Sequence, residues 1–181
     1  NKAMACFSML FGIGLFIHYS GVMDMCAIEH HPDWARVGPN GERDAGATSV
    51  FGPYVDELMI PQVVEAAKAY QLDGIWADGE CWGAQLDWSP AALAAWTKET
   101  GLAEAPKKRG DAHWEEWKAF HRRHFESYLR HWTESVRTAV PGFQVTSNWM
   151  YTTFAPKPVD VDLDFLSGDY SPTLSVDRAR V

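Results

Sequence analysis

The chain has 181 residues, of which 46% are hydrophobic and 22% are charged, so it is long enough for one folded domain and its composition argues against disorder. A formal net charge of −8 argues against a nucleic-acid partner and against binding to an anionic membrane surface. The three cysteines, Cys6, Cys26 and Cys81, contain no CxxC pair and predict no disulfide framework. The apolar stretch 9–17 is too short to span a bilayer and runs into polar residues without a signal-peptide cleavage pattern.

The first third of the chain predicts one strand and one helix with a long segment between them. Residues 12–19, GIGLFIHY, predict a strand in which Ile17 faces a helical layer and His18 faces the other way, because successive side chains alternate. Residues 21–55 carry three prolines and several glycines, and we interpret them as a long irregular segment. Residues 56–70 predict a helix, with Pro61 near its start.

The rest of the chain predicts three strands and two helices. The strands are 74–78, 143–149 and 164–168, each a short apolar run that stops in polar residues. A helix over 90–101 begins at Ser89-Pro90 and ends at Gly101, and a longer helix covers 111–139. His121 and His124 lie on the apolar stripe of the longer helix, where we expect packing histidines and not metal ligands.

Strands that alternate with helices or long connections predict a parallel sheet, whose strand ends meet at one edge. In such sheets, the carboxyl ends of the strands carry the binding and catalytic residues. Here every strand ends in polar and aromatic residues, whereas no GxGxxG or GxxxxGK loop follows any strand. The four endings are His18-Tyr19-Ser20, Asp78-Gly79-Glu80, Asn148-Trp149 and Asp169-Tyr170.

Two carboxylates, Asp78 and Glu80, follow the strand 74–78 and are the main candidates for catalytic residues. Trp76, Asp78 and Glu80 share one face of that strand, and about 6.7 Å of extended backbone separates the two acids. Glycosidases use a pair of carboxyl groups, one ionised and one protonated, at roughly 5–5.5 Å for retention or 6.5–9.5 Å for inversion of the anomeric centre. Gly79 between the two acids allows the chain to bend, so the backbone spacing does not fix the distance between the side chains. The alternatives are that both acids cap the next loop or pair with arginine, or that Cys81 is a nucleophile.

The segment 62–79, in which a helix leads into Gly74-Ile75-Trp76-Ala77-Asp78-Gly79, resembles glycoside hydrolase family 29, the α-L-fucosidases. The resemblance implies a (β/α)8 barrel, Asp78 as the nucleophile of a retaining mechanism and Trp76 as a wall of the sugar pocket. Residues 14–20 look like the preceding strand of that family, which implies that Tyr19 contacts sugar. The extended motif Asp-Gly-Glu-Cys-Trp, with Asp-Trp-Ser-Pro downstream, is similar to uncharacterised hydrolases related to the family.

The chain departs from the family pattern where Asn148-Trp149 stands in place of Asn-Asp-Arg, so the substrate is not carried over. We expect residues 1–181 to be part of a single TIM-barrel catalytic domain, α/β in class and incomplete, with about four strands, since a whole barrel takes about 250 residues.

The expected function is cleavage of a glycosidic bond, with a carbohydrate as partner and no cofactor or metal. The alternatives are a non-catalytic carbohydrate-binding barrel and a metal-dependent hydrolase that uses Asp78, Glu80 and histidines at the same edge. His30-His31 with Asp33 is a weaker metal candidate. The catalytic candidates are Asp78, Glu80 and Asp169, with Asp24 as a weaker choice, and the substrate-binding candidates are His18, Tyr19, Trp76, Trp82, Asn148, Trp149 and Tyr170.

Overall fold

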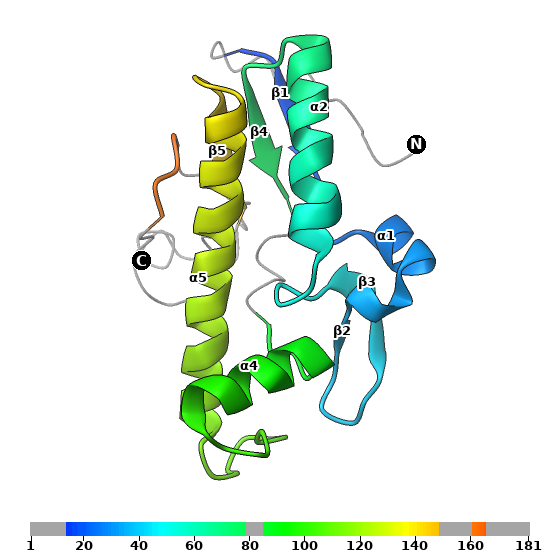
Figure 1. The fold of residues 1–181 in the computed structure, drawn as a ribbon, viewed down its shortest axis with the longest axis vertical. Helices are drawn as coiled ribbons and strands as arrows, with labels where there is room; N and C mark the ends of the chain where they lie inside the picture. Colours follow the sequence, from blue (N-terminus) through cyan, green and yellow to red (C-terminus); the bar gives the residue numbers. More distant parts are fainter. Residues whose placement is uncertain (1–13, 79–84, 149–160, 166–181) are drawn as a thin grey trace, which may run out of the picture.

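A computed structural model describes residues 14–78, 85–148 and 161–165. Its central feature is a parallel sheet of β1 (Phe16–Tyr19), β4 (Gly74–Ala77) and β5 (Gln144–Ser147), in the order β1-β4-β5 (Figure 1). The register places His18 beside Trp76 and Trp76 beside Thr146. The three strands start and stop together, so their carboxyl ends lie at one edge, as the alternation of strands and helices predicted.

The side-chain alternation of the strands gives the sheet one fully apolar face. Ile17, Ile75 and Val145 are each 0% exposed and belong to one hydrophobic core. Burying such a side chain stabilises the fold by about 1.5–3 kcal/mol. Two helices cover this face, α2 (Ile60–Tyr70) and α5 (Trp114–Ala139), which lie side by side in Figure 1. The opposite face carries His18, Trp76 and Thr146.

The predicted helix 56–70 is present, but its first part has a wider turn. Residues Val55–Met59 form the π-helical turn η2, in which the backbone N–H of Ile60 donates to the carbonyl of Val55, and α2 continues from there. Pro61 has no N–H to donate, so the regular helical ladder cannot run through this point. The helix ends at Gln71, whose φ of 52° closes it in the left-handed region.

The expectation of an irregular segment over 21–55 was wrong. This part of the chain forms α1 (Met25–His30), the 3-10 turn η1 (Pro32–Trp34) and an antiparallel hairpin of β2 (Ala35–Val37) and β3 (Arg43–Thr48). Asp24 caps α1 by accepting a hydrogen bond from Ala27 N at 2.9 Å. A tight turn joins the hairpin strands, with Gly41 at a φ of 88°. Neither strand has the apolar alternation that would have revealed it.

A second, smaller core lies between α4 (Pro90–Thr100) and the first half of α5. Trp96, Trp117 and Phe120 are its buried members, and their rings pack edge-on or stacked at 5.1–5.4 Å between centroids. Helix α4 begins at the cap Ser89 and ends at Gly101, as its sequence signals predicted. Helix α5 begins at Trp114, three residues later than predicted.

The fourth predicted strand, 164–168, is described only at Asp164 and Phe165. Neither residue is in a strand, yet both lie beside β5: Asp164 N donates to Val145 O at 3.0 Å, and Thr146 Oγ1 donates to Phe165 O at 2.6 Å. The Phe165 ring also packs edge-on against Phe16 at 5.7 Å. The chain therefore returns next to β5, on the side away from β4.

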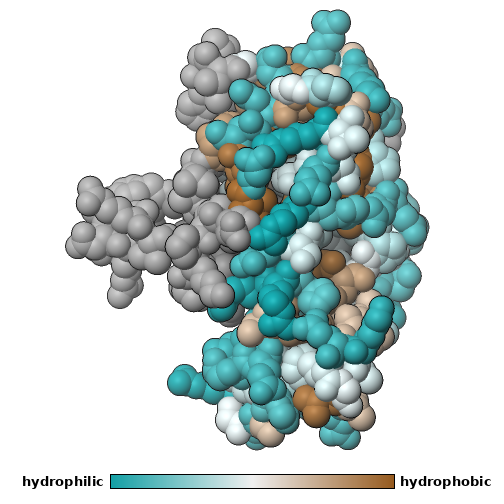
Figure 2. Space-filling model, turned by 60° about the vertical axis from the view of Figure 1, so that its left-hand side comes forward, coloured by the Kyte–Doolittle hydropathy of each residue, from teal (hydrophilic) through white to brown (hydrophobic). Residues whose placement is uncertain are grey.

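The face turned forward in Figure 2 carries mainly hydrophilic residues, with smaller apolar areas between them. Ion pairs also join α5 to other segments: Arg123 pairs with Glu99, and Arg137 pairs with Asp162 and Asp164. Among the described helices, none is both long enough and apolar enough to cross a bilayer.

Candidate active site

The three parallel strands bring one polar side chain each to the same place. Asp78 follows β4, and its Oδ2 lies 3.1 Å from Nε2 of His18 on β1. Its Oδ1 accepts a hydrogen bond at 2.7 Å from Nδ2 of Asn148, which follows β5. The backbone N–H of Asp78 donates to Tyr19 O at 2.6 Å, which extends the β1–β4 pairing by one residue. Both carboxylate oxygens are thus oriented by neighbouring strands.

The contacts of Asp78 fit an ionised carboxylate that receives a hydrogen bond on each oxygen. An ionised carboxylate only accepts hydrogen bonds, so Nε2 of His18 carries the proton and the amide nitrogen of Asn148 faces Oδ1. The side chains of His18 and Asp78 are 27% and 38% exposed, whereas Asn148 is fully buried. A ligand that enters beside the sheet would therefore meet His18 and Asp78 and not Asn148.

An aromatic wall stands next to the carboxylate. The imidazole of His18 stacks on the indole of Trp76 with 4.7 Å between ring centroids and 30° between planes. These two residues are register partners on adjacent strands, and their side chains share the face on which Asp78 lies. The sequence parity argument placed Trp76 and Asp78 on one face, and the structure has them there.

Tyr19 does not belong to this group of side chains. It is 2% exposed, its hydroxyl donates to Gln62 Oε1 on α2 at 2.9 Å, and the Tyr54 hydroxyl oxygen lies 3.4 Å from its own oxygen. Because Tyr19 follows His18 directly, its side chain faces the helices together with Ile17. The expected sugar contact of Tyr19 is therefore corrected: its place is in the core, and strand parity already carried that signal.

The remaining site candidates divide into two sets. Asp24, the weakest acid/base candidate, is 8% exposed and caps α1, and its other oxygen lies 3.3 Å from the Tyr54 hydroxyl, which donates at 2.7 Å to Gly21 O. The structure thus gives Asp24 a capping role. The others lie outside the described residues: Glu80, Trp82, Trp149, Asp169 and Tyr170.

Within the described part of the chain, no three His, Cys, Asp or Glu side chains are arranged to hold a metal ion. Nδ1 of His30 hydrogen-bonds to Cys26 O at 2.8 Å, and His31 stacks on Trp34 at 3.8 Å. The pair His30-His31 therefore has local packing roles.

Asp87 is a residue whose importance the sequence reasoning missed. It is 2% exposed, and its Oδ1 accepts from Val37 N at 3.0 Å and Ser89 N at 2.8 Å. Its Oδ2 accepts from the hydroxyls of Ser49 at 2.5 Å and Ser89 at 3.0 Å. The hairpin and the start of α4 are thereby joined through one carboxylate.

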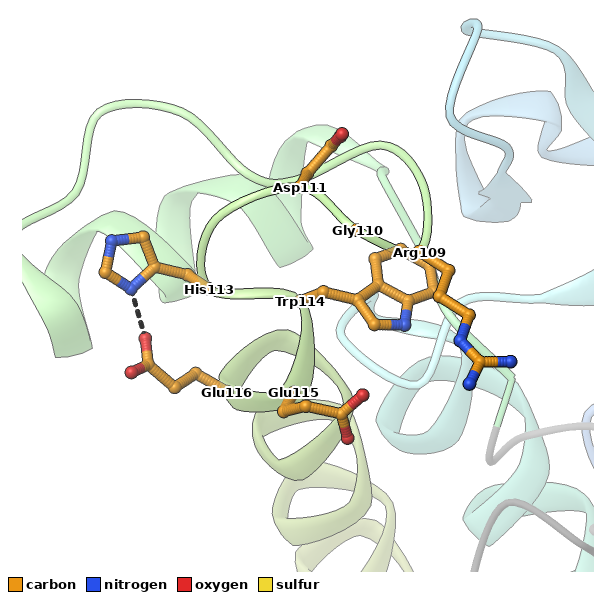
Figure 3. Close-up of a pocket in the computed structure, with 7 residues that line it drawn as sticks. All are labelled: Arg109, Gly110, Asp111, His113, Trp114, Glu115 and Glu116. Carbon is orange, nitrogen blue, oxygen red and sulfur yellow. Dashed lines mark hydrogen bonds and ion pairs between the residues drawn. The ribbon is translucent and has the colours of Figure 1, made fainter.

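A pocket of about 410 Å³ lies elsewhere, at the start of α5 (Figure 3). His113 pairs with Glu116 there, and the backbone N–H groups of Lys107 and Lys108 donate to Asp111, which holds the pKa of Asp111 below its usual value. These contacts are local to the loop and the first helical turn. The lining residues are Arg109, Gly110, Asp111, His113, Trp114, Glu115 and Glu116.

Comparison with known proteins gives a likeness in fold. No protein-family model matches the sequence, and no curated protein sequence matches it. The structure is similar to the alpha-L-fucosidase isoenzyme 2 from Paenibacillus thiaminolyticus, with 23% identity and a TM-score of 0.59, over 78% of this chain and 21% of that one. It is also similar to the beta-galactosidase from Rahnella sp. R3, with 17% identity and a TM-score of 0.58, over 91% of this chain and 30% of that one. The chain thus spans less than a third of either protein, and its fold is like part of a glycoside hydrolase.

Proposed function

We propose that this chain is part of a (β/α)8-barrel glycoside hydrolase in which Asp78 is the nucleophile of a retaining mechanism. The observation that carries the proposal is the placement of Asp78 at the carboxyl end of the middle parallel strand, with a hydrogen-bond donor on each oxygen. In α/β sheets this edge carries the chemistry. The fold likeness to a fucosidase and a galactosidase supports the same class of reaction.

The proposed chemistry follows from the state of the carboxylate. Donors on both oxygens favour the ionised form, which is the form that attacks an anomeric carbon. The glycosidic bond breaks as the Asp78 oxygen bonds to that carbon, and an acid protonates the departing oxygen. Water then releases the sugar and gives a proton to the same acid, now acting as base. Glu80 and Asp169 are the acid/base candidates on sequence grounds.

The stacked rings of Trp76 and His18 support a carbohydrate as the substrate. The indole offers a flat apolar surface beside the carboxylate, which suits the apolar face of a pyranose ring, and the imidazole offers a polar edge. The resemblance of the segment 62–79 to the α-L-fucosidase family supports cleavage of a glycoside, whereas the departure at Asn148-Trp149 leaves the sugar open. The substrate class is therefore proposed as a glycoside with an apolar ring face.

The Asp78→Asn variant of the complete protein tests this function. We expect turnover of aryl glycosides to fall at least about 10³-fold, because the amide cannot attack, while sugar binding measured by calorimetry persists. Asp73→Asn, at the other end of the same strand, is the matched control and keeps turnover. Full activity of Asp78→Asn would refute the proposal.

Two further results identify the alternatives. Sugar binding by the unaltered protein without any turnover would indicate a carbohydrate-binding barrel. Turnover that disappears in excess chelator would indicate a metal-dependent hydrolase.

A further inference from the structure

The side-chain amide of Asn148 donates a hydrogen bond to Asp78, but its own oxygen lacks a hydrogen-bond donor among the described residues. Its Nδ2 donates to Asp78 at 2.7 Å, and the residue is 0% exposed. Within the described residues, its Oδ1 is buried and accepts no hydrogen bond. The reverse orientation of the amide would place Oδ1 against the carboxylate oxygen, so the carboxylate determines which way the amide points.

A buried acceptor without a donor destabilises a fold by about as much as one hydrogen bond to a charged group stabilises it. Packing alone would therefore be served as well by an apolar side chain of the same size. An apolar side chain could not, however, donate a hydrogen bond to Asp78 as Asn148 does.

The two donors to Asp78 differ in one respect. Of the described residues that hydrogen-bond to the carboxylate, His18 on β1 has a side chain that is 27% exposed, whereas the amide of Asn148 donates at every pH because it is not a titratable group. Asn148 is also buried, so a ligand does not reach it without displacing its neighbours. Its expected role as a contact to sugar hydroxyls therefore does not fit its place.

We propose that Asn148 is a positioning residue that acts through Asp78, keeping the carboxylate ionised and fixing its direction toward the substrate. The expected effect on catalysis rests on the proposed function. The expected effect on the ionisation of Asp78 does not depend on it. Losing the Asn148 donor would disfavour the ionised form, because a hydrogen bond to the charged state would be gone.

The test compares Asn148→Leu with Thr146→Val in the complete protein. Thr146 lies on the same face of β5, is equally buried, and donates to Phe165 O and not to Asp78, which makes it the matched control. The titration of the Asp78 carboxyl is followed by NMR on protein carrying ¹³C-labelled aspartate, with Asp78→Asn used to assign the signal. This NMR titration does not require the protein to turn over a substrate.

We expect Asn148→Leu to raise the titration midpoint of Asp78 by about one to two pH units and to lower kcat about 10- to 100-fold with little change in KM. The acid limb of the activity profile moves to higher pH by the same amount. Thr146→Val leaves both quantities unchanged. Should Asn148→Leu fail to fold, Asn148→Ala provides the same readings, because it also lacks a side-chain donor.

The outcomes separate the two proposals. A shifted midpoint in a protein that never cleaves glycosides would support the positioning role and refute the glycosidase. Turnover with an unshifted midpoint, or a rise in KM without a change in kcat, would overturn the positioning role and leave the glycosidase standing.

Discussion

His121 makes the stability of this fold depend on pH in a defined direction. The side chain is 1% exposed within α5, and its Nδ1 lies 2.9 Å from Trp117 O. That carbonyl can only accept, so Nδ1 carries the proton and Nε2 accepts from Asp87 N at 3.0 Å. Burial lowers the pKa of His121, against the opposing effect of its backbone hydrogen bonds. The neutral form is therefore the one that fits.

The sign of the effect follows from proton binding. Below about pH 6.5 the unfolded chain takes up a proton at this histidine, whereas the folded chain resists it. Stability from this group is complete above about pH 6.5 and falls as the pH drops toward the lower folded pKa. The slope is at most about 1.4 kcal/mol per pH unit, so lowering the pH from about 6.5 to about 5.5 costs at most about 1.4 kcal/mol.

Urea denaturation of the original protein and of His121→Phe at several pH values measures this slope. Phenylalanine keeps the ring packing against Phe51 and Phe120 but cannot titrate, so the variant is less stable near neutral pH and has a flatter profile. His30→Gln, at an exposed histidine, is the control and keeps the slope of the original protein. An unchanged slope in His121→Phe would refute the reasoning.

Asp164 titrates at a lower pH than the range in which the His121 slope is measured, so it does not contribute to that slope. Burial works to raise the pKa of Asp164, but hydrogen bonds from Arg137 and from Val145 N hold that pKa below the usual 3.8. Its stabilising contribution is therefore lost only as the pH falls below about 4, outside the range in which His121 titrates.

Three further predictions follow from single contacts. Asp87→Ala leaves buried N–H groups without acceptors and lowers the free energy of unfolding by about 3–5 kcal/mol in urea, while Asp87→Asn costs about 1–2 kcal/mol because one oxygen remains. Gly74→Ala places a Cβ 2.2 Å from the Phe16 ring and 2.5 Å from Gln144 O, so thermal unfolding shows at least about 1–3 kcal/mol of destabilisation. Trp76→Ala removes the wall beside His18, and steady-state kinetics show a higher KM for aryl glycosides.

The sequence predicted the parts of the fold that repeat a simple period. Ile17, Ile75 and Val145 mark buried strand faces, and the signals at Ser89 and Gly101 bound a helix, because parity and capping are local properties. The meeting of His18, Asp78 and Asn148 followed from the parallel arrangement alone.

Other features depend on contacts between distant residues. The hairpin over 35–48 has little apolar alternation and is held by its turn and by Asp87, which lies far along the chain. The resemblance to a family pattern favoured Tyr19 as a sugar contact, although alternation places it with Ile17 in the core. Local geometry was the better guide at that position.

Covalent trapping tests the role of Asp78 most directly. A retaining glycosidase treated with a 2-deoxy-2-fluoro glycosyl fluoride accumulates its glycosyl-enzyme, because the fluorine slows release more than it prevents attack. With probes of the L-fuco and D-galacto configurations, peptide mass spectrometry is predicted to find the sugar on Asp78, and no adduct in Asp78→Asn. An adduct on another carboxylate, with Asp78 unmodified, would contradict the assignment of the nucleophile.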